Sequence, residues 1–87
     1  MNTTQTIYLN GKSYADGKAV HRALQRLLDL PEYYGMNADA LYDCLSERKQ
    51  PVSLYIAGMG EGDVAETLKK VRCVMEDLGG TVTVREE

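Results

Sequence analysis

Three short stretches of the chain alternate apolar and polar residues, and this period of two predicts three strands. The stretches cover residues 6–9, 52–56 and 82–84, and each borders on glycine, proline or asparagine residues typical of turns. A strand with polar side chains at every second position buries one face and exposes the other. We therefore expect a sheet that is covered on one side only.

Helical periods of three and four residues fill the intervals between these strands. They predict a first helix over residues 17–29, capped by Asp16, and a short helix over residues 38–45, capped by Asn37. A third helix is expected after Asp63, which has a glutamate three residues later, the spacing of a capping box. In each case a side-chain oxygen is available to accept a hydrogen bond from the first turn.

The resulting order of elements is β-α-α-β-α-β. Strands that are joined through helices run parallel, because the connection has to cross back over the sheet. With 87 residues the chain offers one core two layers deep and no room for a second domain. We therefore predict a single domain over residues 1–87, a two-layer α/β fold with a three-stranded parallel sheet and helices packed on one face.

The overall charge of −3 argues against binding to nucleic acid, whose phosphates require a basic surface. Two cysteines and one histidine are too few for the usual four-ligand zinc site, so we expect no metal and no cofactor. No apolar run approaches the roughly 18 residues of a membrane span, and residues 1–6 are too polar for a secretion signal. We expect a cytoplasmic protein without membrane contact. Its thiols, a core Cys44 and a partly exposed Cys73, should stay reduced.

The charge is distributed unevenly along the chain. Between Arg26 and Arg48 there is no basic residue and there are five acidic ones, namely Asp29, Glu32, Asp39, Asp43 and Glu47. Asp39 and Asp43 lie four residues apart on one side of the short helix, where like charges destabilise it by roughly 0.2–0.5 kcal/mol. A solvated acidic face is the simplest interpretation, and a pair of catalytic carboxylates is another.

Three of the six tyrosines, Tyr33, Tyr34 and Tyr42, lie in the same acidic segment. We expect one of them to fill the core, since a short segment that also buries Leu41 and Leu45 has no room for all three. Exposed tyrosine beside carboxylate is typical of an interface anchor, because the ring is large, rigid and able to stack. The segment is therefore a candidate surface for binding another protein.

The run from Leu30 to Leu45 reads LPEYYGMNADALYDCL. It resembles the barstar family, intracellular protein inhibitors of small bacterial ribonucleases of the barnase type, and a weaker likeness extends over nearly the whole chain. The resemblance implies a three-stranded parallel sheet with helices on one side, the fold that the hydrophobic pattern also predicts. It further implies a protein that is no enzyme and blocks the active site of its target with residues 30–47.

The family likeness assigns roles to individual side chains of this segment. By position, Asp43 enters the phosphate-binding pocket of the ribonuclease, and Asp39 pairs with a basic residue at the rim of that pocket. Tyr33 lies against the catalytic histidine ring of the enzyme. The residues expected at the partner interface are Tyr33, Asn37, Ala38, Asp39, Tyr42, Asp43, Ser46 and Glu47.

Three positions depart from the pattern of the best-known member of the family. Arg48 stands where that member has an interface tryptophan, and Ala38 stands where it has a leucine. A further acidic contact of the family, on the last helix, maps to Val74. These differences bear on which ribonuclease is the target.

Our main hypothesis is a ribonuclease inhibitor that acts by occlusion, forms an equimolar complex with a small basic ribonuclease and is a monomer when free. The alternative is an immunity or regulatory module of the same fold directed at another basic toxin or partner. A small hydrolase that uses paired carboxylates is the third hypothesis. Turnover of a substrate by the isolated protein would favour the hydrolase, whereas equimolar loss of a nuclease's activity would favour the inhibitor.

Overall fold

The computed structural model describes residues 5–85, and its elements follow one another in the predicted order. The strands are β1 (Gln5–Leu9), β2 (Val52–Ile56) and β3 (Val82–Val84). The helices are α1 (Gly17–Leu27), α2 (Ala38–Ser46) and α3 (Gly62–Asp77), and a 3-10 turn, η1 (Gly11–Ser13), follows β1. The predicted strands and helices are thereby confirmed.

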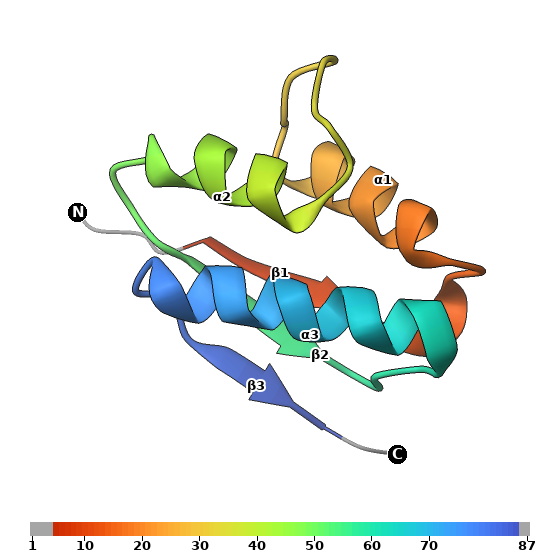
Figure 1. Ribbon diagram of the computed structural model, residues 1–87. Coiled ribbons are helices and arrows are strands. Elements are labelled where there is room, and N and C mark those ends of the chain that lie inside the picture. Colours follow the sequence, from red (N-terminus) through yellow and green to blue (C-terminus); the bar gives the residue numbers. More distant parts are fainter. Residues whose placement is uncertain (1–4, 86–87) are drawn as a thin grey trace.

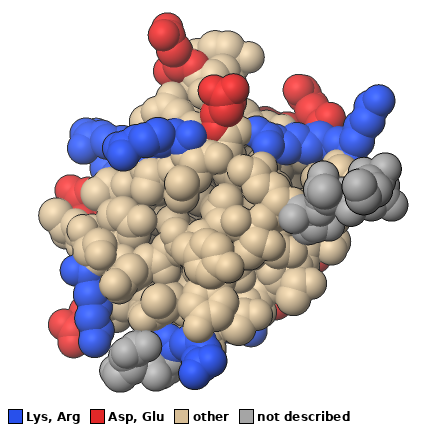
Figure 2. Space-filling model, turned by 180° about the vertical axis from the view of Figure 1, so that it is seen from behind, with Lys and Arg blue, Asp and Glu red and all other residues tan. Residues whose placement is uncertain are grey.

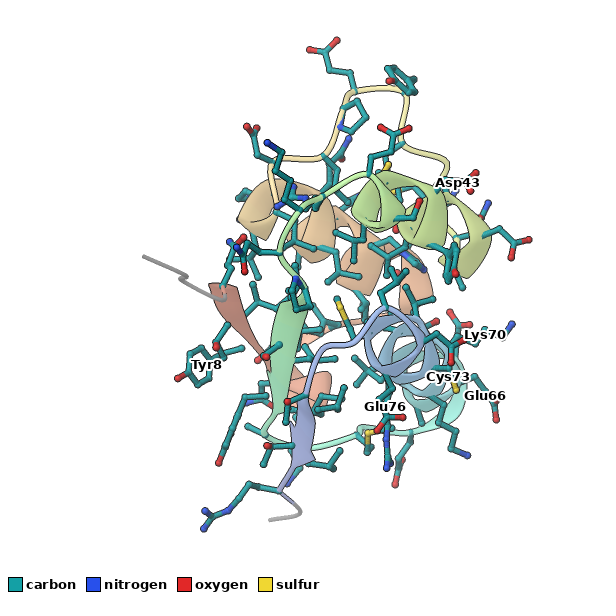
Figure 3. All side chains as sticks on the ribbon, turned by 90° about the vertical axis from the view of Figure 1, so that its left-hand side faces the viewer. Tyr8, Asp43, Glu66, Lys70, Cys73 and Glu76 are labelled. Atoms are coloured by element: carbon teal, nitrogen blue, oxygen red, sulfur yellow. The ribbon has the colours of Figure 1, made fainter. Side chains whose placement is uncertain are left out.

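β2 is the central strand of a parallel sheet with the order β1-β2-β3. The register places Leu54 beside Ile7 of β1 and Val82 of β3, and these side chains face the helices. All three helices lie on that face of the sheet (Figures 1 and 3). Between the layers lies a core that includes Leu9, Leu24, Leu41, Ile56, Leu68 and Met75. This is the predicted two-layer α/β fold.

The opposite face of the sheet carries no helix. Tyr8 and Tyr55 are neighbours in register there, with ring centroids 5.4 Å apart and ring planes tilted by 45°. Figure 3 shows Tyr8 pointing away from the helices. Figure 2 shows the face itself, with charged side chains mainly around its border and other residues in the middle. The alternation of polar residues in the strands thus reflects an uncovered face.

The ends of α1 follow the sequence prediction only in part. Asp16 caps the N-terminus as predicted, its Oδ1 accepting a hydrogen bond from the N–H of Ala19 at 2.9 Å. The C-terminus lies at Leu27, before the predicted end, because Asp29 takes a left-handed conformation with φ 53°. The N–H of the next residue then donates to the carbonyl of Gln25 at 2.9 Å, the closing hydrogen bond of a Schellman motif.

The predicted capping box at the start of α3 is wrong. Glu61 is the N-cap residue, and it makes no side-chain cap hydrogen bond. Asp63 turns to α1 instead, where its Oδ2 accepts a hydrogen bond from the N–H of Gly17 at 2.6 Å. The carboxylate stabilises the first turn of α1 and joins α3 to it.

Candidate protein-binding site

The predicted interface lies on the α1–α2 loop (residues 28–37) and on α2. In Figure 1 this loop, drawn in yellow, stands out from the body of the molecule on the side away from the sheet. Asn37 is the N-cap of α2, as predicted. Its Oδ1 accepts a hydrogen bond from the N–H of Ala40 at 2.8 Å, and its Nδ2 donates to the carbonyl of Gly35 at 3.1 Å. The side chain of Asn37 thus caps the helix and also binds the last residues of the loop.

The acidic side chains of this region are all exposed, namely Asp29, Glu32, Asp39, Asp43 and Glu47. Within residues 5–85 the ion pairs join residues of α3 to each other, so these carboxylates have no ion-pair partner there. Asp39, Asp43 and Glu47 follow at intervals of four residues along one side of α2, where like charges repel. Glu47 also caps the negative end of the helix. The acidic row weakens α2 and presents a surface suited to a cationic partner.

Arg48, the first base after the acidic segment, is engaged with α1. Its guanidinium donates one hydrogen bond to the carbonyl of Leu28 and another to Oε1 of Gln5 at 3.5 Å. A cation at the C-terminal end of a helix interacts favourably with the helix dipole. The side chain that replaces the family's interface tryptophan thus joins the end of α2 to the end of α1.

One of the three tyrosines of the segment is buried and two are exposed, as predicted. Tyr34 is 5% exposed, whereas Tyr33 and Tyr42 are 87% and 42% exposed. Burial raises the pKa of the Tyr34 hydroxyl, and the nearby thiol of Cys44 adds to the shift. Tyr34 is therefore a neutral core residue, while Tyr33 offers nearly its whole ring for stacking.

A hollow of about 420 Å³ lies between the α1–α2 loop and α2. It brings together three of the predicted interface residues, Tyr33, Asp43 and Glu47. Asp29 joins them, although the sequence prediction did not include it. The remaining lining residues are Leu30, Pro31, Cys44 and Arg48. The hollow combines an aromatic ring with three carboxylates, the groups that a cationic side chain of a partner binds.

The other predicted residues lie outside this hollow. Asn37 and the half-buried Ala38 line a second hollow of about 270 Å³, which is bordered by residues of α1 and α3. Asp39, Tyr42 and Ser46 line neither hollow and are exposed on α2. The predicted interface residues are thus distributed over the loop, one side of α2 and the mouth of the second hollow.

Two positions differ from what the sequence alone indicates. Val74, where the family's acidic contact on the last helix maps, is 7% exposed and belongs to the core, so it does not reach a partner. Asp29 faces the hollow because it holds the left-handed position of the Schellman motif. The turn itself was not predictable from the residue type, because glycine or asparagine is usual at that position. The one signal in the sequence that Asp29 belongs to the site is its place in the acidic segment.

No helix within residues 5–85 is long and apolar enough to cross a membrane. The same residues contain no group of three or more His, Cys, Asp or Glu side chains arranged to hold a metal ion. Both cysteines are free thiols, Cys44 half-buried and Cys73 exposed on α3. Figure 3 shows Cys73 on the side of α3 that faces away from the sheet.

Comparison with known proteins agrees with the resemblance seen in the sequence. A family model described as "Barstar (barnase inhibitor)" matches residues 4–84. A curated protein of Bacillus subtilis (strain 168), "Putative ribonuclease inhibitor YrdF", is 42% identical over 40 residues. That alignment covers 46% of this chain and 44% of the relative, so it compares less than half of either sequence.

Proposed function

Because the chain belongs to the barstar family, we propose that it inhibits a small basic bacterial ribonuclease of the barnase type. Residues 30–47 enter the active site of the ribonuclease and exclude RNA, in an equimolar complex and without a reaction of their own. The name of the Bacillus subtilis relative supports the same activity. The observation that carries the proposal is the set of exposed carboxylates that have no ion-pair partner among residues 5–85, since proteins bind the phosphates of nucleic acid with cationic side chains.

Within this proposal the two sides of the hollow have different roles. Asp43 acts as a phosphate mimic and pairs with the cationic groups that normally bind RNA. Tyr33 stacks on the catalytic histidine of the enzyme, for which its ring is almost fully exposed. Asp39, one turn before Asp43 on α2, pairs with a cation at the rim. Once these charge pairs are buried, RNA can no longer reach the cations of the enzyme.

Titration of purified barnase with the protein tests this function. Cleavage of a short fluorescent RNA is followed while the inhibitor is added in increments. We expect the activity to fall linearly and to vanish at one inhibitor per enzyme, with no cleavage by the protein alone. Full activity of barnase in a large excess of the protein would contradict the barnase-type target. Cleavage by the isolated protein would contradict its role as a non-enzymatic inhibitor.

A second candidate function is that of an immunity or regulatory module against another basic toxin. Two positions favour it. Val74 is buried where the family has an acidic contact, and Arg48 is bound to the end of α1 where the family has an interface tryptophan. Such a protein would bind the same kind of cationic surface with a different rim. The same titration, carried out with a panel of small basic nucleases, distinguishes the two functions by which enzyme loses its activity.

A further inference from the structure

The α1–α2 loop contains neither helix nor strand, yet it includes Tyr33 and Asn37, the N-cap of α2. A free loop of this length would sample many conformations, and ordering it on binding would reduce the affinity. Its end even includes an unfavourable backbone conformation, because Met36 has φ 57°. Contacts elsewhere in the molecule therefore have to hold the loop in place.

The beginning of the loop is held by Gln25 of α1. The main-chain carbonyl of Gln25 accepts the hydrogen bond from the N–H of Leu30 at 2.9 Å. Its side-chain Nε2 donates to the carbonyl of Pro31 at 2.8 Å. One half-buried residue thus holds two successive residues of the loop.

The end of the loop is held by His21, one turn earlier on α1. Its Nδ1 lies 2.7 Å from the hydroxyl of Tyr34, and both side chains are buried, with exposures of 6% and 5%. The hydroxyl in turn lies 3.4 Å from the carbonyl of Asn37, the N-cap of α2. A phenol has one proton, so both contacts are hydrogen bonds when Nδ1 donates to the hydroxyl and the hydroxyl donates to the carbonyl. This chain of hydrogen bonds links α1 to Asn37, the N-cap of α2.

We propose that His21 and Gln25 are positioning residues for the predicted interface on the α1–α2 loop and α2. Their side chains bind Tyr34 and Pro31 and so fix the position of Tyr33 between these two attachments. This inference rests on the proposed function and extends it to side chains that the partner does not touch. A loop that is ordered in only a fraction of the molecules binds more weakly by that fraction. The two residues therefore act on affinity through the conformation of the free protein.

The variants Tyr34→Phe and Gln25→Met test this proposal, because each removes one hydrogen-bonding group and nearly preserves the volume. Val84→Ala is the control, since it removes apolar volume from β3 and touches none of the loop contacts. β3 is the edge strand that lies beyond β2 from β1. Amide hydrogen exchange is measured in the free proteins, and the affinity for barnase is measured under conditions in which all of them are folded. We expect exchange of the hydrogen-bonded loop amides, those of Leu30 and Tyr34, to accelerate and the affinity to fall by roughly two- to tenfold in each loop variant. Val84→Ala should change neither.

A pair of substitutions at His21 separates positioning from packing. His21→Leu removes the donor, whereas His21→Asn keeps an amide near the position of Nδ1, so we expect slow loop exchange to be restored in part only by asparagine. Loop exchange that is unchanged in Tyr34→Phe, Gln25→Met and His21→Leu would overturn the proposal. If the wild-type protein does not bind barnase, the proposed target fails, while the exchange measurement still decides whether His21 and Gln25 order the loop.

Discussion

Asp43 is exposed on α2 and has Asp39 one turn before it and Glu47 one turn after it. Within residues 5–85 its carboxylate forms no ion pair, and both acidic neighbours on α2 repel it. It lines the same hollow as Tyr33, on the surface, where packing of the core does not require a carboxylate. Under the proposed function, a partner of opposite charge would give this residue a physical reason to be acidic.

Replacing Asp43 by alanine should therefore separate binding from stability. Alanine is the better helix former and relieves the repulsion, so the free energy of unfolding should stay constant or rise by at most about 1 kcal/mol. The affinity for barnase should fall by roughly 2–5 kcal/mol, because cations of the enzyme would stay buried and unpaired; the barnase–barstar complex, from this family, is itself a source of that range. Urea melts and inhibition titrations measure the two quantities.

Two further variants complete this experiment. Asp43→Asn keeps the shape of the side chain and should bind nearly as poorly as Asp43→Ala, because the proposed function requires the negative charge. Asp77→Ala makes the same change at an exposed position of α3 and should inhibit like the wild type. An Asp43→Ala protein that is less stable yet inhibits at full strength would show that the carboxylate is structural.

Asp29 provides a test of local backbone strain. Its φ of 53° costs a residue with a side chain roughly 1–2 kcal/mol, part of which glycine would return through its greater freedom in the unfolded chain. Asp29→Gly should therefore raise the free energy of unfolding by about 0.5–1 kcal/mol in urea melts. Asp29→Ala keeps the strain and serves as the control. Equal stability of the two variants would contradict this account of how α1 ends.

At the scale of elements, hydrophobic periodicity was sufficient to predict the helices, the strands and their order. The ends of the helices were less predictable wherever the partner of a capping group is distant in sequence. Asp63 has the spacing of a local capping box, but its carboxylate binds Gly17, 46 positions away. A side chain of this kind chooses between local and distant donors only after the helices have packed, and this choice is not encoded in the local pattern.

The same limit applies to the candidate site. The sequence predicted that one tyrosine of the segment is buried, but not which one, because the choice depends on the hydrogen bond from His21 to Tyr34. Composition indicated an acidic surface, whereas the inclusion of Asp29 in the hollow depends on the left-handed turn after α1. Arg48 likewise reaches its acceptor, the carbonyl of Leu28, only when folding has brought the end of α1 close to the residue that follows α2.

The packing of α1 against the loop also predicts a pH dependence of stability. Burial lowers the pKa of His21 below its ordinary value of about 6.5, and the carboxylate of Asp63 offsets a smaller part of the shift. Tyr34 contacts the ring, and Lys18 and Lys70 line the same hollow. The unfolded chain therefore binds a proton at a higher pH than the folded protein. This contribution to stability is complete above about pH 6.5 and is lost as the pH falls through the lowered pKa of the folded state.

Urea melts at about pH 7.5 and about pH 5.5 measure this dependence, because the interval includes the titration of an ordinary histidine. The variant His21→Asn has no histidine, so its change in stability represents all the other titratable groups of the chain. We expect the wild type to lose more stability than the variant between the two values. Equal losses would show that His21 has the same pKa in the folded and unfolded chain.

At the scale of the whole molecule, the acidic residues lie on the loop and α2, away from the open sheet face. Figure 3 places Asp43 on the helical side and Tyr8 on the opposite side, and Figure 2 shows few charges in the middle of the sheet face. The net charge of −3 therefore understates the field above α2, where no base occurs between Arg26 and Arg48. A cationic enzyme approaching the protein is attracted to that side.

This field predicts that association with barnase slows as salt is added. The barnase–barstar pair is itself a reference case for such steering, so only the direction is predicted here. At physiological ionic strength the screening length is about 8 Å, and exposed carboxylates lose much of their reach. Stopped-flow rates should fall from low to physiological salt, and should fall further when Glu32 and Glu47 are both changed to glutamine. Changing Glu61 and Glu66 of the α3 region to glutamine removes the same charge and should have little effect. Rates that are independent of salt, or equally slowed by both pairs, would contradict attraction by the acidic loop and α2.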